Sequence, residues 1–174
     1  MNQDQIKQLN EAVEAVKTRK IENVYFVACG GSKAIFDPAQ FIFDRETTLP
    51  SFVYNANEFI HRCPKGLGEN SLVVTCSHSG NTLETTRATQ LAGDKGALTI
   101  SFSYRVDSPL WKATQHPISY VWGPESNPGD NNNGMLYRLV FSILNVLQPN
   151  EKYERAIKAC DNPVSYTHLT LPTT

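Results

Sequence analysis

The segment Ser77–Thr82, with the sequence Ser-His-Ser-Gly-Asn-Thr, brings three hydroxyl side chains and a glycine together within six residues. Gly80 can adopt a backbone conformation that presents successive N–H groups, and a helix starting near Thr82 would add its own unpaired N–H groups and dipole. These parts match the needs of a phosphate monoester, which accepts many hydrogen bonds. A Ser/Thr helix cap beside a glycine turn would show the same residues, so the sequence alone leaves both interpretations open.

Two apolar runs would position this loop and a second one like it. Leu72–Cys76 precedes Ser77, and Val24–Cys29 precedes Gly30-Gly31-Ser32. Neither run alternates with polar residues, which is typical of strands buried on both faces in a parallel sheet. Right-handed crossovers place the carboxyl ends of parallel strands on one edge, where such folds bind their ligands. We therefore expect both loops to open on the same edge.

The whole chain alternates strands with helices, which predicts an α/β fold: a three-layer αβα sandwich around a parallel sheet of about five strands. The predicted strands are 24–29, 51–54, 72–76, 97–102 and 118–122. The predicted helices are 3–19, 38–45, 56–62, 82–92, 107–113, 135–147 and 151–160. Asp37 is expected to cap the second of these helices after a turn-like stretch at 32–36, and residues 123–134 are expected to form a loop.

The S-x-S-G-x-T pattern of residues 77–82 resembles the phosphate loop of SIS (sugar isomerase) domains. Two further segments agree in the same order. Tyr25–Ser32 is similar to the opening strand and loop of the fructosamine-6-phosphate deglycase branch, and Arg105–Leu110 fits an acidic-Ser-Pro-Leu segment common in these domains. The resemblance covers about residues 20–150. It implies a flavodoxin-like sheet, a sugar-phosphate ligand, and kinship with deglycases and the isomerase domain of glucosamine-6-phosphate synthase.

The resemblance also implies which residues bind the ligand. Those placed against the phosphate, through hydroxyls or backbone N–H groups, are Ser32, Ser77, Ser79, Gly80, Asn81 and Thr82. Gly31 and His78 are possible substrate contacts, and His78 stands where relatives often have glutamine. A simple turn serine at position 32 and a solvated histidine at position 78 are the alternatives. No catalytic residue, metal or cofactor is assigned.

The implied function is that of the N-terminal SIS domain, residues 1–163, of a fructosamine-6-phosphate deglycase or aminosugar-phosphate isomerase. In such enzymes the general base and the ring-opening group come largely from a second SIS domain or a neighbouring subunit, so this chain alone is not expected to catalyse the reaction. Residues 164–174 continue no pattern and are interpreted as a foreign or disordered tail. The alternatives are a sugar-phosphate-sensing SIS module of a regulator, although only about twenty residues precede the first strand, and an unrelated flavodoxin-like domain.

Composition limits the possible partners and the cellular location of the protein. A formal net charge of -1 gives no basic footprint for nucleic acid and no cationic face for a membrane. No signal peptide or long apolar stretch is present in the sequence, and its cysteines form no CxxC pair or metal-ligand spacing. We therefore expect free thiols in a cytoplasmic protein. The apolar helix at 135–147, together with the family's habit of pairing SIS domains, predicts an oligomer.

Overall fold

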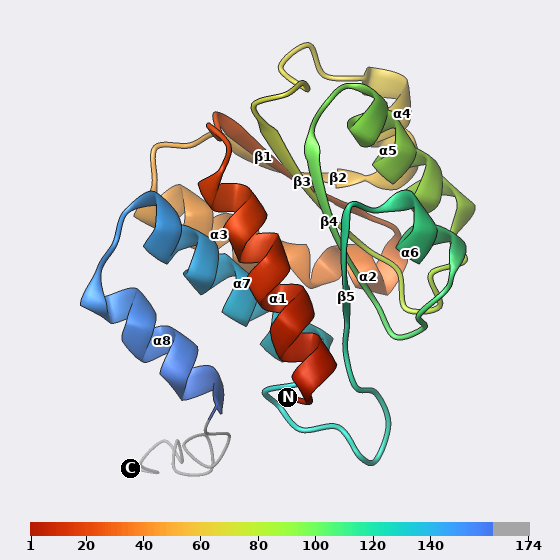
Figure 1. Cartoon of the computed structure of the whole chain (residues 1–174). Coiled ribbons are helices and arrows are strands. Elements are labelled where there is room, and N and C mark those ends of the chain that lie inside the picture. Colours follow the sequence, from red (N-terminus) through yellow and green to blue (C-terminus); the bar gives the residue numbers. More distant parts are fainter. Residues whose placement is uncertain (162–174) are drawn as a thin grey trace, which may run out of the picture.

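The computed structural model describes residues 1–161, which fold around a five-stranded sheet (Figure 1). All its strands are parallel, in the order β2-β1-β3-β4-β5. They are β1 (Asn23–Ala28), β2 (Ser51–Asn55), β3 (Ser71–Cys76), β4 (Leu98–Ser103) and β5 (His116–Ser119). This is the strand order of flavodoxin-like folds, so the predicted fold class is confirmed.

Eight helices lie within the described residues. They are α1 (Gln3–Lys17), α2 (Gly30–Ala34), α3 (Phe36–Glu46), α4 (Ala56–Arg62), α5 (Leu83–Asp94), α6 (Pro109–Ala113), α7 (Asn132–Leu147) and α8 (Glu151–Asp161). The segment 164–174, which the sequence analysis interprets as a tail, lies outside the described residues.

The helices form two layers, one on each face of the sheet (Figure 1). Helices α1, α3 and α7 cover one face, with α8 packed on α7, while α4, α5 and α6 lie on the other side. Adjacent residues of β1 contact opposite helix layers. Phe26 packs on Phe36 and Phe43 of α3. Tyr25 packs on Phe59 of α4. Burial on both faces explains why the strand sequence does not alternate.

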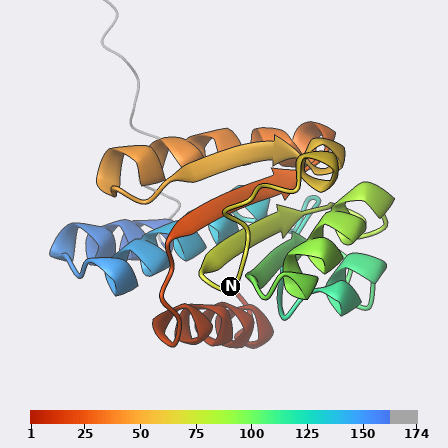
Figure 2. The ribbon, with the colours of Figure 1, turned by 90° about the horizontal axis from the view of Figure 1, so that it is seen from above.

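The carboxyl ends of the strands meet at one edge of the sheet. Ala28 at the end of β1 is paired with Cys76 at the end of β3, and Cys76 is paired with Phe102 near the end of β4. The orange and olive arrowheads of β1, β2 and β3 accordingly point to the same side in Figure 2. The segments after β1, β3 and β4 therefore start next to one another, and the prediction that the loops after β1 and β3 share an edge is confirmed.

Several local expectations are wrong. Residues 30–34 form the short helix α2 rather than part of a turn-like stretch, and α3 follows after one residue. Helix α3 begins at Phe36 with Ile35 in the N-cap position, so Asp37 is not its cap. Pro38 fits in the first turn because a backbone N–H there would have no helical partner.

Strand β5 ends earlier than predicted. It stops at Ser119, and the N–H of Val121 donates to the carbonyl of Asp130 in the following loop at 2.8 Å. The chain leaves the sheet there because the N–H of Val121 pairs with that loop and not with β4. Tyr120 and Trp122, expected inside the strand, therefore lie beyond it at the carboxyl edge.

Helix α7 starts at Asn132, three residues before the predicted start, and Asn131 caps it by accepting from the N–H of Gly134 at 2.9 Å. Its large apolar residues, including Met135 and Leu139, are buried in the core of this chain. Most of the apolar side of α7 thus packs within the chain itself, and the expected oligomer remains a prediction.

Candidate phosphate-binding site

The loop Ser77–Thr82 joins β3 to α5 and is fixed along its first half by the segment after β4. The N–H of Ser77 donates to the carbonyl of Phe102 at 3.1 Å, and the N–H of Tyr104 donates to the carbonyl of His78 at 3.0 Å. These bonds continue the pairing of two buried strands past their regular ends. The loop therefore leaves the sheet in a defined direction.

Gly80 forms the turn of the loop and contacts the start of α6. Its φ is +68°, a conformation that a side chain disfavours. Its N–H donates to the carbonyl of Ser77 at 3.1 Å, and its own carbonyl accepts from Leu110 at 3.0 Å. A Cβ atom on Gly80 would lie 2.0 Å from Oγ of Ser108. This position accepts only glycine without displacement of α6.

The hydroxyl groups face one another across the loop. Oγ of Ser77, which is buried, lies 2.9 Å from Oγ1 of Thr82. Oγ of Ser79 accepts a bond from the N–H of Asn81 at 3.2 Å. Thr82 occupies the N-cap position of α5, yet its side chain makes no capping bond. An ordinary threonine cap therefore does not describe this residue, because its hydroxyl is turned toward Ser77 instead.

The first turn of α5 consequently has no side-chain cap. Uncapped N–H groups at the start of a twelve-residue helix, with the positive dipole end behind them, form a favourable place for an anion. The N–H groups of Gly80 and Asn81 are already bonded inside the loop. An anion here would take its donors from the helix start and the hydroxyls, or would replace the bond between Asn81 and Ser79.

The first loop lies beside the second. Ser32 in α2 is half-buried and lies near Cys76, the residue before Ser77. Burial raises the pKa of this thiol to about 12, and the neighbouring Ser32 side chain lowers it only in part. Cys76 is thus a neutral thiol at physiological pH. Gly31 is exposed and faces open space.

His78 is exposed, but its ring is in contact with three aromatic side chains. Its Nδ1 lies 2.8 Å from the hydroxyl of Tyr120. Its ring stacks on Tyr104 with centroids 5.4 Å apart and meets Trp122 edge-on at 4.9 Å. The histidine of the loop is therefore held by contacts with other segments while its ring stays exposed.

Sequence reasoning missed the three aromatic residues of this group and the role of Ser108 against Gly80. Tyr104 follows β4, while Tyr120 and Trp122 follow β5. All three come after strands whose carboxyl ends share the edge with Ser77. The rule that places both glycine loops at that edge would have found them, had it been applied to the last two strands as well.

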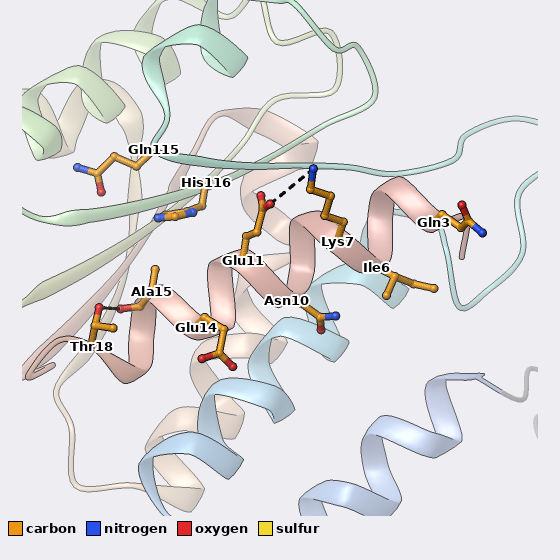
Figure 3. A pocket seen from close by; sticks show the side chains of 10 residues that line it. All are labelled: Gln3, Ile6, Lys7, Asn10, Glu11, Glu14, Ala15, Thr18, Gln115 and His116. Carbon is orange, nitrogen blue, oxygen red and sulfur yellow. Dashed lines mark hydrogen bonds and ion pairs between the residues drawn. The ribbon is translucent and has the colours of Figure 1, made fainter.

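Two hollows among the described residues lie elsewhere. One of about 820 Å³ runs along α1 and the start of β5, between Ile6, Glu14 and His116 (Figure 3). Figure 3 also shows the ion pair of Lys7 with Glu11 at its rim. Another of about 700 Å³ lies between α3, α7 and α8. Neither includes a residue of Ser77–Thr82, so cavity size alone does not indicate the site.

No group of three or more His, Cys, Asp or Glu side chains in residues 1–161 is arranged to hold a metal ion. None of the helices described combines the length and the apolar content that crossing a membrane requires.

Comparison with known proteins gives a consistent picture. Residues 17–147 match the model of the SIS domain. The chain is 46% identical to the fructosamine deglycase FrlB of Bacillus subtilis over 89% of its own length and 48% of that protein. It is 30% identical to the fructoselysine 6-phosphate deglycase of Escherichia coli K12 over 79% of its length and 40% of that protein. The chain thus spans about half the length of these relatives.

A crystal structure of a candidate phosphosugar isomerase from Bacillus subtilis superimposes with a TM-score of 0.86 at 46% identity. The superposition covers 89% of this chain and 48% of that one. The matched family segment runs from the end of α1 to the end of α7, and so includes the whole sheet and the loop after β3. This chain belongs to the SIS domain family.

Proposed function

We propose that this chain binds a 6-phosphorylated ketosamine as the N-terminal SIS domain of a fructosamine-6-phosphate deglycase. The observation that carries the proposal is the geometry of the loop after β3. Thr82 faces Ser77 and does not cap α5, so two hydroxyls and an uncapped helix start are close together. The 46% identity to a fructosamine deglycase favours this branch over an aminosugar-phosphate isomerase, which is the second form of the proposal.

In this proposal the phosphate accepts hydrogen bonds from Ser77, Ser79, Thr82 and the N–H groups at the start of α5. Ser32 completes the site from the neighbouring loop. The loop Ser77–Thr82 contains no Lys, Arg, Asp or Glu, so recognition relies on neutral donors and on the helix dipole. Anchoring the phosphate would hold the far end of the sugar in place, so that binding energy orients its C1–C2 carbons.

The chemical step needs more than this loop provides. Deglycation, like aldose–ketose isomerisation, requires a general base at C1–C2 and a group that assists ring opening. We propose that a second SIS domain or a neighbouring subunit supplies both, because the deglycase relatives are about twice as long as the matched segment. Residues 1–163 would then act as the phosphate-binding half of a cytoplasmic enzyme.

The test is a calorimetric titration of the chain with a ketosamine 6-phosphate, glucosamine 6-phosphate and fructose 6-phosphate. The informative variant is Thr82→Val, which removes one hydroxyl and keeps the shape. Loss of a hydrogen bond to a charged group costs about 1.5–3 kcal/mol, so its affinity should fall about tenfold to a hundredfold. Thr18→Val is the matched control, because the Thr18 hydroxyl bonds only to the end of α1 in its surroundings.

A parallel thermal measurement guards against a folding artefact. A ligand at about 100 times its dissociation constant should stabilise the parent chain by about 2.7 kcal/mol. Tightest binding of the ketosamine 6-phosphate would support the deglycase form of the proposal, and tightest binding of glucosamine 6-phosphate would support the isomerase form. If folded Thr82→Val binds all three as tightly as the parent chain, the loop after β3 is not the phosphate site and the proposal is wrong.

A further inference from the structure

The rings around His78 form a compact cluster at the carboxyl edge of the sheet. We call it the ring platform and define it as His78, Tyr104 and Trp122, supported from below by Tyr120. Ring centroids within the platform are 4.9 Å apart for His78 and Trp122, 5.4 Å for His78 and Tyr104, and 6.0 Å for Tyr104 and Trp122. These separations are those of directly interacting aromatic pairs.

The platform is exposed although its rings are largely apolar. Tyr104 is 42% exposed and Trp122 is 62% exposed, whereas Tyr120 beneath them is only 4% exposed. A contiguous group of exposed aromatic rings is unfavourable in water and marks a surface that meets another molecule. The two faces of the cluster therefore differ: one belongs to the core, and the other is available for contact.

The platform is also held rigidly. Its histidine is fixed by the phenol of Tyr120 at 2.8 Å and by the bond between its own carbonyl and the N–H of Tyr104. Burial raises the pKa of the Tyr120 phenol, which therefore stays neutral at physiological pH. A neutral phenol can either donate a hydrogen bond to Nδ1 of His78 or accept one from it, so this contact holds the ring in place. The rings are thus arranged before any ligand arrives.

The position of the platform indicates what it meets. His78 lies between Ser77 and Ser79, so the ring surface begins inside the proposed phosphate loop. A molecule anchored by its phosphate at Ser77–Thr82 can extend from the loop across these rings. The electron-rich faces of Trp and Tyr attract cations. The complementary ligand carries an anion at one end and a cation beyond it.

We propose that the ring platform is the subsite for the protonated amine end of a ketosamine 6-phosphate, held over the rings of Trp122 and Tyr104. This inference rests on the proposed function, since it names the ligand part that lies beyond the phosphate. Trp122 and Tyr104, both outside the phosphate loop, would then distinguish a ketosamine 6-phosphate, which carries a protonated amine, from a sugar phosphate that lacks this amine.

The experiment compares three probes: a ketosamine 6-phosphate with a protonated amine, fructose 6-phosphate with a hydroxyl in its place, and inorganic phosphate. Trp122→Leu and Tyr104→Leu are the test variants. Phe41→Leu is the matched control, because Phe41 is 63% exposed on α3 and lines the hollow between α3, α7 and α8. Trp122→Leu should weaken the ketosamine about threefold to tenfold and leave the other two probes within about twofold.

A fluorescence readout tests contact directly. The chain has two tryptophans, so Trp111→Phe leaves Trp122 as the reporter. The ketosamine should change its emission at saturation, and inorganic phosphate should not. If Trp122→Leu weakens all probes equally or none of them, while the parent chain still binds phosphorylated ligands, the subsite is refuted and the phosphate loop stands. If the folded parent chain binds none of the probes, both proposals fall together.

Discussion

Replacing Gly80 by alanine should destabilise the protein and damage the loop after β3 together. The new Cβ would lie 2.0 Å from Oγ and 2.4 Å from Cβ of Ser108, so α6 or the loop must move. The backbone φ of +68° adds a second cost. A side chain in the left-handed region costs about 1–2 kcal/mol and an overpacked contact about 1–3 kcal/mol, giving about 2–5 kcal/mol in total.

Urea denaturation followed by circular dichroism measures the free energy of unfolding. Calorimetric titration with a sugar phosphate measures the affinity of the loop after β3 for its ligand. For a chain of this size each kcal/mol lowers the melting temperature by about 2–4 °C. We expect a decrease of about 4–20 °C. The folded fraction of Gly80→Ala should also bind sugar phosphates more weakly, because the first turn of α5 would shift with Gly80.

Two companion variants separate strain from contact. Gly93→Ala is the matched control, because Gly93 lies in α5 with open space around it, and it should stabilise the chain by about 0.5–1 kcal/mol. Adding Ser108→Gly to Gly80→Ala removes the clashing atoms, while losing this helix cap costs only a few tenths of a kcal/mol. The double variant should recover about 1–3 kcal/mol. A Gly80→Ala protein as stable as the parent would refute the reasoning.

Three further predictions concern other parts of the fold. Arg138→Leu should lower the free energy of unfolding by about 2–4 kcal/mol, because this buried side chain donates hydrogen bonds to the carbonyls of Gly129 and Cys160. Asp161→Asn, which neutralises the exposed carboxylate paired with Arg138, should lower it by less than about 1 kcal/mol. Urea denaturation measures both changes. The buried thiol of Cys76, with its pKa of about 12, should resist iodoacetamide at pH 8 until guanidinium unfolds the chain, and mass spectrometry that finds it alkylated in the folded protein would contradict this burial. Burial lowers the pKa of His116 below 6.5, so the folded state binds fewer protons than the unfolded state; thermal stability should therefore fall as the pH drops through about 6.5, and less so in His116→Gln.

The sheet could be predicted because each strand carries its own evidence. Leu72–Cys76 is apolar at nearly every position, and such a run fits few environments other than the middle of a parallel sheet. Two glycine-containing loops after two such runs then share an edge by geometry alone. The candidate phosphate loop follows from local sequence for the same reason, since its hydroxyls and glycine lie within six residues.

Features that depend on distant contacts were not predicted. Helix α2 contains two adjacent glycines, whose low helix propensity favours a turn, and its place between β1 and α3 overrides that preference. The bond between His78 and Tyr120 joins residues 42 positions apart. The contact between Gly80 and Ser108 likewise joins residues that are far apart in the sequence. A periodic pattern describes one element at a time, so it cannot report which side chains meet across the edge of a sheet.

The loop Ser77–Thr82 shares its backbone hydrogen bonds with Phe102, Tyr104 and Leu110, so its shape is linked to that of the segment from the end of β4 to the start of α6. Neither segment can open while the other keeps all its bonds. Their amide protons should therefore exchange with solvent through a common opening motion. A ligand would meet a loop whose conformational entropy was already lost when the chain folded, and little further ordering would oppose its association.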